Sequence, residues 1–470
     1  MKYISTRGES PPLAFMETLL AGLAPDGGLY LPEFYPRLAE DEIAAFAGKP
    51  YADVARAVIA PFIGGEIEPQ ALQGMIEAAY CTFRHPAIAP LAQIDGNLFV
   101  LELFHGRTLA FKDIAMQLLA RLIDHALKAR RQRATIVGAT SGDTGAAAIE
   151  AFRGLSQVDV FILFPHGRVS DVQRRQMTTT GADNVHAIAI EGTFDDAQAA
   201  IKAMFNHAAL REELKLCGVN SINWARILAQ TVYYFTSAVV LGAPRRPVSF
   251  CVPTGNFGDI FAGWIAKRMG LPIDRLIVST NSNDILPRAL ATGSYAVNGV
   301  HATQSPSMDI QVSSNFERLL FESLGRDAAA LRALMAQLRQ SGGFTIPPPA
   351  LAAIRAEFDA FAVSEEDTTR EIAKTFAQTG FLPDPHTAVG IHAARKAQTT
   401  TPLVALGTAH PAKFAAAIER ATGVPPALPE TLAGLKDLPE LYTVLPNDQS
   451  EIERFVRARA RAATPKRAAS

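Results

Sequence analysis

The sequence predicts an α/β fold built around open, mostly parallel β-sheets. From about residue 98 onward, short β runs alternate with longer amphipathic stretches, which is the pattern of βαβ units. Two connecting loops, residues 138–145 and 253–259, are rich in Gly, Ser, Thr and Asn, and each lies between a predicted strand and a predicted helix. Residues 1–80 lack this rhythm and are typical of helix with intervening turns. We therefore expect two open sheet domains with flanking helices and a mainly helical N-terminal domain.

Changes in the same pattern indicate where domains begin and end. Residues 282–380 are rich in predicted helix and poor in β runs, so we interpret them as an elaboration of the larger sheet domain. The predicted parts are an N-terminal domain (1–85), a large α/β domain (86–130 with 245–430), a smaller α/β domain (131–244) and a C-terminal extension (431–470).

Each predicted element has its own local signal. The strands are runs of β-branched and aromatic residues at 134–137, 158–164, 185–190, 248–252 and 402–406. The helices are amphipathic stretches at 146–152, 171–180, 194–214, 223–241 and 260–269, with a further helix from Pro411. Ser170 is the expected N-cap of the helix at 171–180, and Gly181 closes that helix. Residues 454–470 carry six Lys or Arg and little apolar content, which predicts a solvated terminus.

Composition and charge argue against several classes of protein. The chain has 470 residues, of which 48% are hydrophobic and 19% charged, as in ordinary globular proteins. Its net charge of −1 gives no support for binding to nucleic acid or to a membrane surface. The three cysteines are far apart, and no His or Cys spacing indicates a metal site. Without a signal-like start or a long apolar run, we expect a cytoplasmic protein.

Lys112 is the most informative residue, because helical spacing places it on an apolar face. Three, four and seven residues later come Ala115, Met116 and Leu119, so a helix that starts here carries Lys112 inward at its first turn. A buried amine tends to lose its proton, and it can then form a Schiff base with a carbonyl. The alternative is a lysine that extends outward from the helix end.

The segment at 253–259 is a candidate phosphate site. Gly255 and Gly258 allow a close backbone approach, and the start of the following helix offers free N–H groups. An ordinary tight turn between strand and helix would use the same residue types.

Two other loops follow predicted strands. In residues 138–145, Thr140, Ser141 and Thr144 offer hydroxyls, and the loop is a plausible cradle for a carboxylate. Residues 407–413 follow the last strand, at the edge of a sheet where ligands of open α/β folds bind. A Schiff-base lysine, a phosphate cradle and a carboxylate cradle together indicate pyridoxal phosphate acting on an amino acid.

Four motifs resemble those of the threonine synthases, in the long form found in many bacteria and fungi. They are residues 111–113, 140–145, 253–259 and 408–414, and residues 3–8, 24–32 and 220–227 are similar too. The resemblance runs from residue 1 to about residue 420. It implies the tryptophan-synthase-β-like fold, fold type II of the pyridoxal-phosphate enzymes. It also implies the last step of threonine biosynthesis, in which O-phospho-L-homoserine and water give L-threonine and phosphate by γ-elimination and β-addition.

The resemblance also implies roles for individual residues. Lys112 matches the lysine that holds the cofactor as a Schiff base, and as a free amine it is the best candidate to move protons at Cα and Cβ. The cofactor phosphate is held by the loop that Gly255, Asn256, Phe257, Gly258 and Asp259 match. Thr408 matches the residue whose hydroxyl meets the pyridine nitrogen. A neutral hydroxyl there tempers the ring as an electron sink, which suits elimination and addition over transamination.

Asp143 departs from the wider superfamily, whose short-form members have an asparagine facing the ring hydroxyl. A carboxylate beside a phenolate would repel it unless the two shared a proton, so capping of the next helix is at least as good an interpretation.

The substrate requires a second phosphate site. Arg168 and Arg226 are our candidates, with Ser170 and Asn223 as helpers, because an arginine presents a fork of donors to phosphate. Structural arginines are the alternative for both positions. We assign no chemistry to the histidines near the motifs, which are His105, His166 and His410.

Two competing functions share these features. A serine/threonine dehydratase or an O-acetylserine-type synthase would use the same lysine, phosphate loop and hydroxyl, and a non-catalytic homologue that binds pyridoxal phosphate would also retain them. The expected partner is the small-molecule substrate, and the expected assembly is a monomer or a homodimer.

Overall fold

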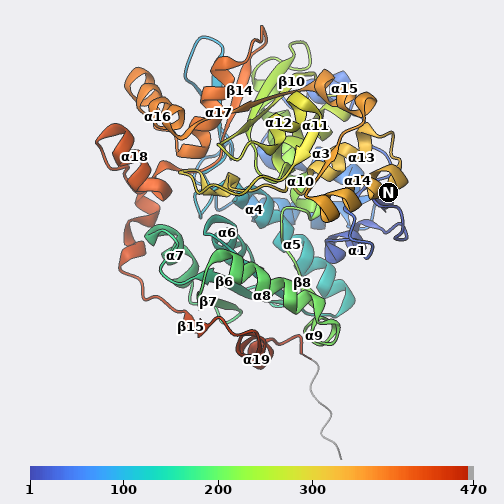
Figure 1. Ribbon diagram of the computed structural model, residues 1–470, viewed down its shortest axis with the longest axis vertical. Helices are drawn as coiled ribbons and strands as arrows, with labels where there is room; N and C mark the ends of the chain where they lie inside the picture. The colour runs from blue at the N-terminus through green and yellow to red at the C-terminus, as the bar shows by residue number, and fades with distance from the viewer. Residues whose placement is uncertain (464–470) are drawn as a thin grey trace, which may run out of the picture. The chain divides into compact units, whose positions relative to one another are not determined.

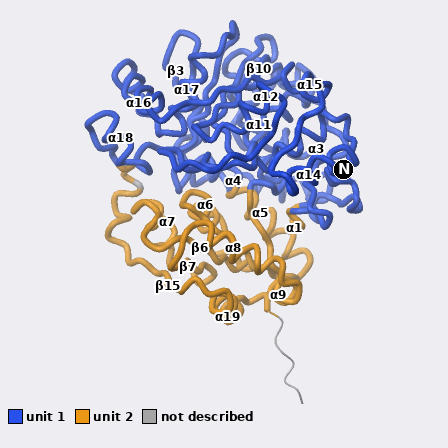
Figure 2. Tube along the Cα trace, viewed as in Figure 1, with its two compact units in different colours: residues 1–18, 23–115, 221–427 blue, residues 19–22, 116–220, 428–470 orange. Residues whose placement is uncertain are grey.

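Two open β-sheets organise the chain, each within its own compact unit (Figures 1 and 2). The computed structural model describes residues 1–463. Unit 1 contains residues 1–18, 23–115 and 221–427, and unit 2 contains residues 19–22, 116–220 and 428 onward. The predicted α/β class with mostly parallel sheets is confirmed. The division into four domains stays a prediction.

The sheet of unit 1 has six strands in the order β13-β10-β9-β14-β4-β3. Their bounds are β3 (Leu91–Gln93), β4 (Leu98–Glu102), β9 (Val248–Pro253), β10 (Ile273–Thr280), β13 (Phe358–Ala362) and β14 (Leu403–Gly407). All neighbours are parallel except β3, which runs antiparallel to β4 at one edge. Strands β9 and β14 were predicted, whereas the buried strand β10 was not. The half-buried edge strand β13 was missed because its sequence contains no β-branched residue.

Helices cover both faces of this sheet, as the contacts of two successive residues of β9 show. Successive side chains of a strand point to opposite faces. The ring of Phe250 packs against Tyr234 of α10 (Trp224–Val240) at 4.7 Å between centroids, whereas Cys251 donates a hydrogen bond of 3.2 Å from Sγ to the carbonyl of Gly390 in α17 (Pro385–Lys396). Helices α10 and α17 therefore lie on opposite faces of the sheet.

The N-terminal segment is mainly helical, as predicted. An antiparallel pair of β1 (Tyr3–Ser5) and β2 (Tyr30–Pro32) accompanies α1 (Phe15–Ala21), α2 (Glu40–Ala44), α3 (Tyr51–Ile63) and α4 (Pro69–Tyr80). Arg318 of α13 (Phe316–Ser323) is fully buried and donates to the carbonyls of Tyr30 at 2.8 Å and Ile222 at 2.7 Å. One guanidinium thus joins the N-terminal segment to two distant parts of unit 1.

The remainder of unit 1 is rich in helix, as expected for residues 282–380. It contains α11 (Gly258–Arg268), α12 (Ile285–Thr292), β11 (Ser294–Ala296), the 3₁₀ turn η1 (Pro306–Met308), α14 (Ala328–Ser341), β12 (Gly343–Thr345), α15 (Pro348–Glu357) and α16 (Glu365–Thr379). The helix predicted from Pro411 begins as a 3₁₀ turn, η2 (Pro411–Phe414), and becomes α18 (Ala415–Thr422).

The sheet of unit 2 is parallel throughout, with strand order β15-β7-β6-β5-β8. The strands are β5 (Ala134–Ala139), β6 (Val158–Pro165), β7 (Val185–Glu191), β8 (Leu216–Cys217) and β15 (Thr443–Pro446). The helices are α6 (Asp143–Phe152), α7 (Asp171–Thr178), α8 (Phe194–Asn206), α9 (Ala208–Leu214), the 3₁₀ segment η3 (Glu430–Lys436), α19 (Gln449–Arg459) and most of α5 (Lys112–Arg130). Ser170 caps α7 as predicted, and its side chain accepts a hydrogen bond from the N–H of Gln173.

Two expectations about unit 2 were wrong. The single helix predicted at 194–214 is broken at His207, whose ψ of 88° ends α8 and starts α9, and both Asn206 and His207 are weak helix formers. The expected solvated terminus is instead the ordered helix α19, whose Ile452 and Val456 are fully buried in the core. The many arginines hid this helical spacing of apolar residues. The rest of the predicted tail, residues 464–470, lies outside the described residues.

Within residues 1–463, no helix is both long and apolar enough to cross a membrane.

Candidate active site

Three neighbouring parallel strands of unit 1 lead into the predicted cofactor residues. Strand β14 lies between β9 and β4. The loop of residues 254–257 follows β9, Thr408 follows β14, and Lys112 follows β4 after a connecting segment. Because ligands of open sheets bind beyond the carboxyl ends of the strands, these segments form the candidate site.

Lys112 is the first residue of α5 and is 8% exposed. Its inward position agrees with the helical spacing, since Ala115, Met116 and Leu119 are fully buried. The Nζ atom lies 4.7 Å from the centroid of the Phe111 ring. The lysine is therefore buried at the start of the helix, with its amine beside an aromatic ring.

The turn before Lys112 is fixed by Asp113. Its carboxylate accepts hydrogen bonds from the backbone N–H of Thr108 at 2.8 Å and from the Thr108 hydroxyl at 2.7 Å. A Cβ atom on Gly106 would lie 2.3 Å from Asp113 Oδ2, so only glycine fits against this carboxylate.

The loop after β9 directs the N-terminus of α11 toward the site. Phe257, its N-cap, has φ 64° and ψ 4°, a left-handed conformation that L-residues seldom adopt. Its ring is buried between Phe316 and Phe358, at 5.3 and 5.8 Å between centroids, and this packing stabilises the turn. A Cβ on Gly255 would lie 2.9 Å from the carbonyl oxygen of Ser307, so glycine is required there as well. The first N–H groups of α11 have no acceptor within the helix and can bind an anion.

Asp259 is placed differently from the rest of this loop. Its carboxylate accepts a hydrogen bond from the hydroxyl of Tyr233, and the Tyr234 hydroxyl donates to its backbone carbonyl at 2.9 Å. Burial raises the pKa of Asp259 to about 7, although the two tyrosine hydroxyls and the charge of Lys112 oppose the shift. The side chain thus belongs to the packing against α10, and only its backbone N–H is suited to a phosphate.

Thr408 is held by its backbone while its hydroxyl stays available. Its N–H donates to Thr387 Oγ1 at 3.1 Å, and its carbonyl accepts from the N–H of Phe111 at 2.8 Å. The Thr408 hydroxyl is buried, and it has no hydrogen-bond partner among the described residues. A buried hydroxyl in this state is unfavourable unless a ligand atom meets it.

These features fit pyridoxal phosphate. The helix N-terminus behind Gly255 suits its phosphate, the unsatisfied hydroxyl of Thr408 suits its ring nitrogen, and Lys112 is the amine that can bond its aldehyde.

Sequence analysis overlooked a buried group beside Thr408. Asp384 is fully buried and accepts hydrogen bonds from the backbone and side chain of His386 and of Thr387. An Asp followed by Pro385 is the usual signal for a helix start, and it could have revealed α17 and its cap.

In unit 2, the predicted carboxylate cradle is a loop organised by Thr140. The Thr140 hydroxyl accepts from the N–H groups of Gly142 and Gly145, both at 2.9 Å, so it is already engaged. Ser141 is exposed and Thr144 is half-buried. Of the two interpretations of Asp143, capping of the next helix is wrong: Gly142 is the N-cap of α6, and Asp143 accepts a hydrogen bond of 2.8 Å from Gln173 Nε2.

The predicted residues for the substrate phosphate are in contrasting environments. Arg168 and Ser170 are exposed in unit 2, on the segment between β6 and α7. Arg226 and Asn223 are buried at the start of α10 in unit 1, where Asn223 is the N-cap, and burial lowers the pKa of Arg226 to about 10.

Of the three histidines near the motifs, two have hydrogen-bond partners within the protein and one is exposed. His105 is paired with Glu102 at 2.7 Å, and His166 is exposed. His410 accepts a hydrogen bond from the N–H of Ala412 at 3.2 Å, and burial lowers its pKa to about 4.

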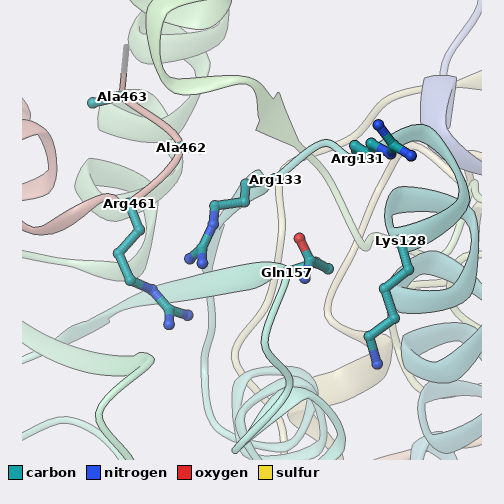
Figure 3. A pocket seen from close by; sticks show the side chains of 7 residues that line it. All are labelled: Lys128, Arg131, Arg133, Gln157, Arg461, Ala462 and Ala463. Carbon is teal, nitrogen blue, oxygen red and sulfur yellow. The ribbon is translucent and has the colours of Figure 1, made fainter. Parts of the chain in front are cut away.

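A pocket of about 540 Å³ in unit 2 contains none of the predicted site residues (Figure 3). It is lined by Lys128, Arg131, Arg133, Gln157, Arg461, Ala462 and Ala463. Lys128 and Arg131 extend in opposite directions in Figure 3, and Lys128 and Arg461 form ion pairs of 2.6 Å with Asp124 and Asp159. Two of its cations are therefore already paired with carboxylates within unit 2.

Comparison with known proteins agrees with this site. The chain matches the family described as threonine synthase N terminus over residues 2–80, the pyridoxal-phosphate dependent enzymes over 82–403, and threonine synthase, C-terminal, over 387–456. It is 53% identical to the threonine synthase of Pseudomonas aeruginosa, over 97% of this chain and 98% of that protein. The chain belongs to the threonine synthase family. Like other threonine synthases, it is a pyridoxal-phosphate-dependent lyase of threonine biosynthesis that acts on a small molecule.

Solved structures of threonine synthases share the fold over nearly the whole chain. The structure of the PLP-bound threonine synthase from Brucella melitensis has a TM-score of 0.97 and 59% identity, and covers 98% of this chain and 100% of that one. The threonine synthase from yeast has a TM-score of 0.93 and 37% identity, and covers 97% and 98%. The predicted fold type II architecture and the predicted cofactor are both confirmed.

Proposed function

We propose that this threonine synthase converts O-phospho-L-homoserine and water into L-threonine and inorganic phosphate with Lys112 as its reacting amine. In the net reaction the Cγ–O bond to phosphate and one Cβ–H bond break, and Cγ gains a proton. The hydroxyl of water joins Cβ, and the remaining proton of water goes to the released phosphate. The observation that carries the proposal is the burial of Lys112 at the first turn of α5, joined through Phe111 to Thr408.

Each group of cofactor residues would bind a different part of pyridoxal phosphate. Lys112 bonds the aldehyde, the backbone N–H groups of residues 255–259 bind the phosphate, and the Thr408 hydroxyl meets the ring nitrogen. When bound, pyridoxal phosphate supplies an electron sink for the negative charge that develops next to Cα. Thr408 carries no charge, so it leaves this sink weaker than a carboxylate would.

Lys112 also acts as the proton carrier. When it is not bonded to the cofactor, its Nζ would move protons at Cα and at Cβ, and it would release the first proton before it accepts the second. The neutral amine is the form that can accept a proton.

The substrate itself requires polar contacts. Ser141 and Thr144, with the loop that Thr140 organises, are our candidates for the substrate carboxylate. Arg168 and Arg226 remain the candidates for its phosphate, with Ser170 and Asn223 as helpers. The exposed Arg168 is the better suited to a transient ligand, because Arg226 is buried within unit 1.

We further propose that the protein works in the cytoplasm without binding nucleic acid or membrane, as a monomer or a homodimer. The near-neutral net charge of −1 supports this proposal. Sedimentation at micromolar concentration would distinguish the two assemblies, and a tetramer would contradict both.

The test is phosphate release from O-phospho-L-homoserine by wild type and by Lys112→Ala, with visible spectra of both. Lys128→Ala is the matched control, since Lys128 lies on the same helix with a side chain that is 56% exposed. We expect threonine and phosphate to appear together in the wild type and the control. In Lys112→Ala, both products and the visible band of the Schiff base should be lost.

Other outcomes distinguish the alternatives. A keto acid formed from serine or threonine without phosphate release would favour a dehydratase. A bound cofactor with no turnover would favour a non-catalytic homologue. Unchanged turnover in Lys112→Ala would overturn the assignment of the lysine.

A further inference from the structure

We propose that Asp384, His386 and Thr387 form one positioning group that fixes the positions of the three cofactor anchors relative to one another. The inference rests on the proposed function, because the anchors are Lys112, Thr408 and the loop at Gly255. The three positioning residues act through these anchors and do not have to contact the cofactor.

Asp384 is the centre of this group. Its Oδ2 accepts from the backbone N–H of His386 at 3.0 Å and from His386 Nδ1 at 2.6 Å. Its Oδ1 accepts from the backbone N–H of Thr387 at 3.0 Å and from the Thr387 hydroxyl. With a side-chain exposure of 0%, this carboxylate is stabilised by protein donors alone.

One arm runs from Asp384 through Thr387 to two of the anchors. The Thr387 hydroxyl uses its single proton toward Asp384, so its lone pair accepts the N–H of Thr408 at 3.1 Å. The carbonyl of Thr408 then accepts the N–H of Phe111 at 2.8 Å, the residue before Lys112. This arm orients the Thr408 hydroxyl and the start of α5 together.

The other arm runs through His386 to the phosphate loop. His386 Nε2 accepts the N–H of Ser307 at 3.2 Å, so the proton of the ring must be on Nδ1, where it is donated to Asp384. The carbonyl of Ser307 lies against Gly255, where a Cβ would approach it to 2.9 Å. His386 thereby fixes the backbone on which the phosphate loop rests.

A role limited to capping α17 would not require this arrangement. An N-cap needs only one acceptor for the first N–H groups, and Asn serves nearly as well as Asp. Asp384 instead satisfies two side-chain donors in addition to the cap. Asn at this position would turn its NH₂ toward one of those donors. The carboxylate oxygen that accepts from His386 Nδ1 also keeps the ring proton of His386 on Nδ1.

The first experiment is to titrate full-length apoprotein with pyridoxal 5′-phosphate and, separately, with pyridoxal, which lacks the phosphate. Asp384→Asn is expected to weaken pyridoxal 5′-phosphate binding by about 10-fold or more, because buried donors lose their acceptor. Asp327→Asn is the matched control, since Asp327 caps α14 and accepts only from the N–H groups of Ala329 and Ala330. It should leave both dissociation constants unchanged.

The two arms make different predictions for the two ligands. Thr387→Val breaks the arm to Thr408 and Lys112, so it should weaken both ligands by the same factor, and Thr387→Ser should restore them. His386→Asn keeps a donor near Asp384 but removes the acceptor for Ser307. It should weaken pyridoxal 5′-phosphate and leave pyridoxal unchanged, and His386→Gln should recover part of the loss.

General destabilisation would not produce this pattern. If every variant weakens the binding of both ligands in proportion to the decrease in its melting temperature, the group only supports the fold and the inference is overturned. Equal binding in Asp384→Asn and wild type would overturn it as well. A wild-type protein that binds no pyridoxal 5′-phosphate would instead refute the proposed function, and the inference with it.

Discussion

Replacing Thr408 by Val should shift the stability of the cofactor-free protein and its affinity for the cofactor in opposite directions. Thr408 is 5% exposed, and its buried hydroxyl has no hydrogen-bond partner among the described residues. Burying such a group costs about 1–3 kcal/mol. Val has nearly the same shape without the hydroxyl, so the free energy of unfolding should rise by about 1 kcal/mol without cofactor.

The same change removes the hydrogen bond proposed to the ring nitrogen. One such bond contributes about 0.5–1.5 kcal/mol, so the dissociation constant of pyridoxal phosphate should increase by up to about 10-fold. A substitution that stabilises the protein and weakens its cofactor is the signature of a polar atom reserved for a ligand.

Tryptophan fluorescence during urea unfolding is a suitable assay. Both tryptophans of the chain, Trp224 and Trp264, lie in unit 1, as does Thr408, so the signal reports the unit that contains the substitution. Thr231→Val is the matched control, because the buried Thr231 hydroxyl donates at 3.2 Å to the carbonyl of Ile227 within α10. A lower urea midpoint for Thr408→Val, together with unchanged cofactor affinity, would refute the reasoning.

Three further substitutions test other parts of unit 1. Because Asp259 has a folded-state pKa of about 7 against 3.8 for the free side chain, the native state binds an extra proton between these values and loses stability as the pH rises from about 4 to 7. Asp259→Asn should therefore gain stability over wild type across that window in urea titrations, and a flat difference would contradict the raised pKa. Gly255→Ala should weaken pyridoxal 5′-phosphate more than pyridoxal, because its Cβ would meet the Ser307 carbonyl at 2.9 Å, and equal weakening would contradict a phosphate role for the loop. Arg318→Met should lower the free energy of unfolding by on the order of 3 kcal/mol, because buried carbonyls lose their donor, and a loss below about 1 kcal/mol would show that they find other partners.

Local patterns predicted much of the fold and the central lysine. Lys112 could be found because its burial depends on residues within two turns of the same helix. Ser170 was identified as an N-cap for the same reason. The edge strands β13 and β15 were missed, because half-exposed strands retain little of the apolar alternation that marks a strand. The inner strand β10 was also missed, although its residues 276–278 are apolar and buried.

The positioning group could not be found in this way. Asp384 and Thr387 act on Thr408, and His386 acts on Ser307, which is 79 positions earlier in the chain. Such partners are set by the order of strands in the sheet, which single-sequence patterns do not reveal. The role of Thr408 was available only from the family resemblance, whereas its unsatisfied hydroxyl supplies an independent physical reason.

The position of β14 has a consequence for how the protein matures on the ribosome. This strand comes almost last in the chain, yet it occupies an inner place in the sheet, between β9 and β4. A nascent chain that stops before residue 403 leaves β4 and β9 with unpaired inner edges and lacks Thr408 altogether. The sheet of unit 1 therefore stays incomplete, and the site lacks one of its three cofactor anchors, until β14 and Thr408 have been synthesised.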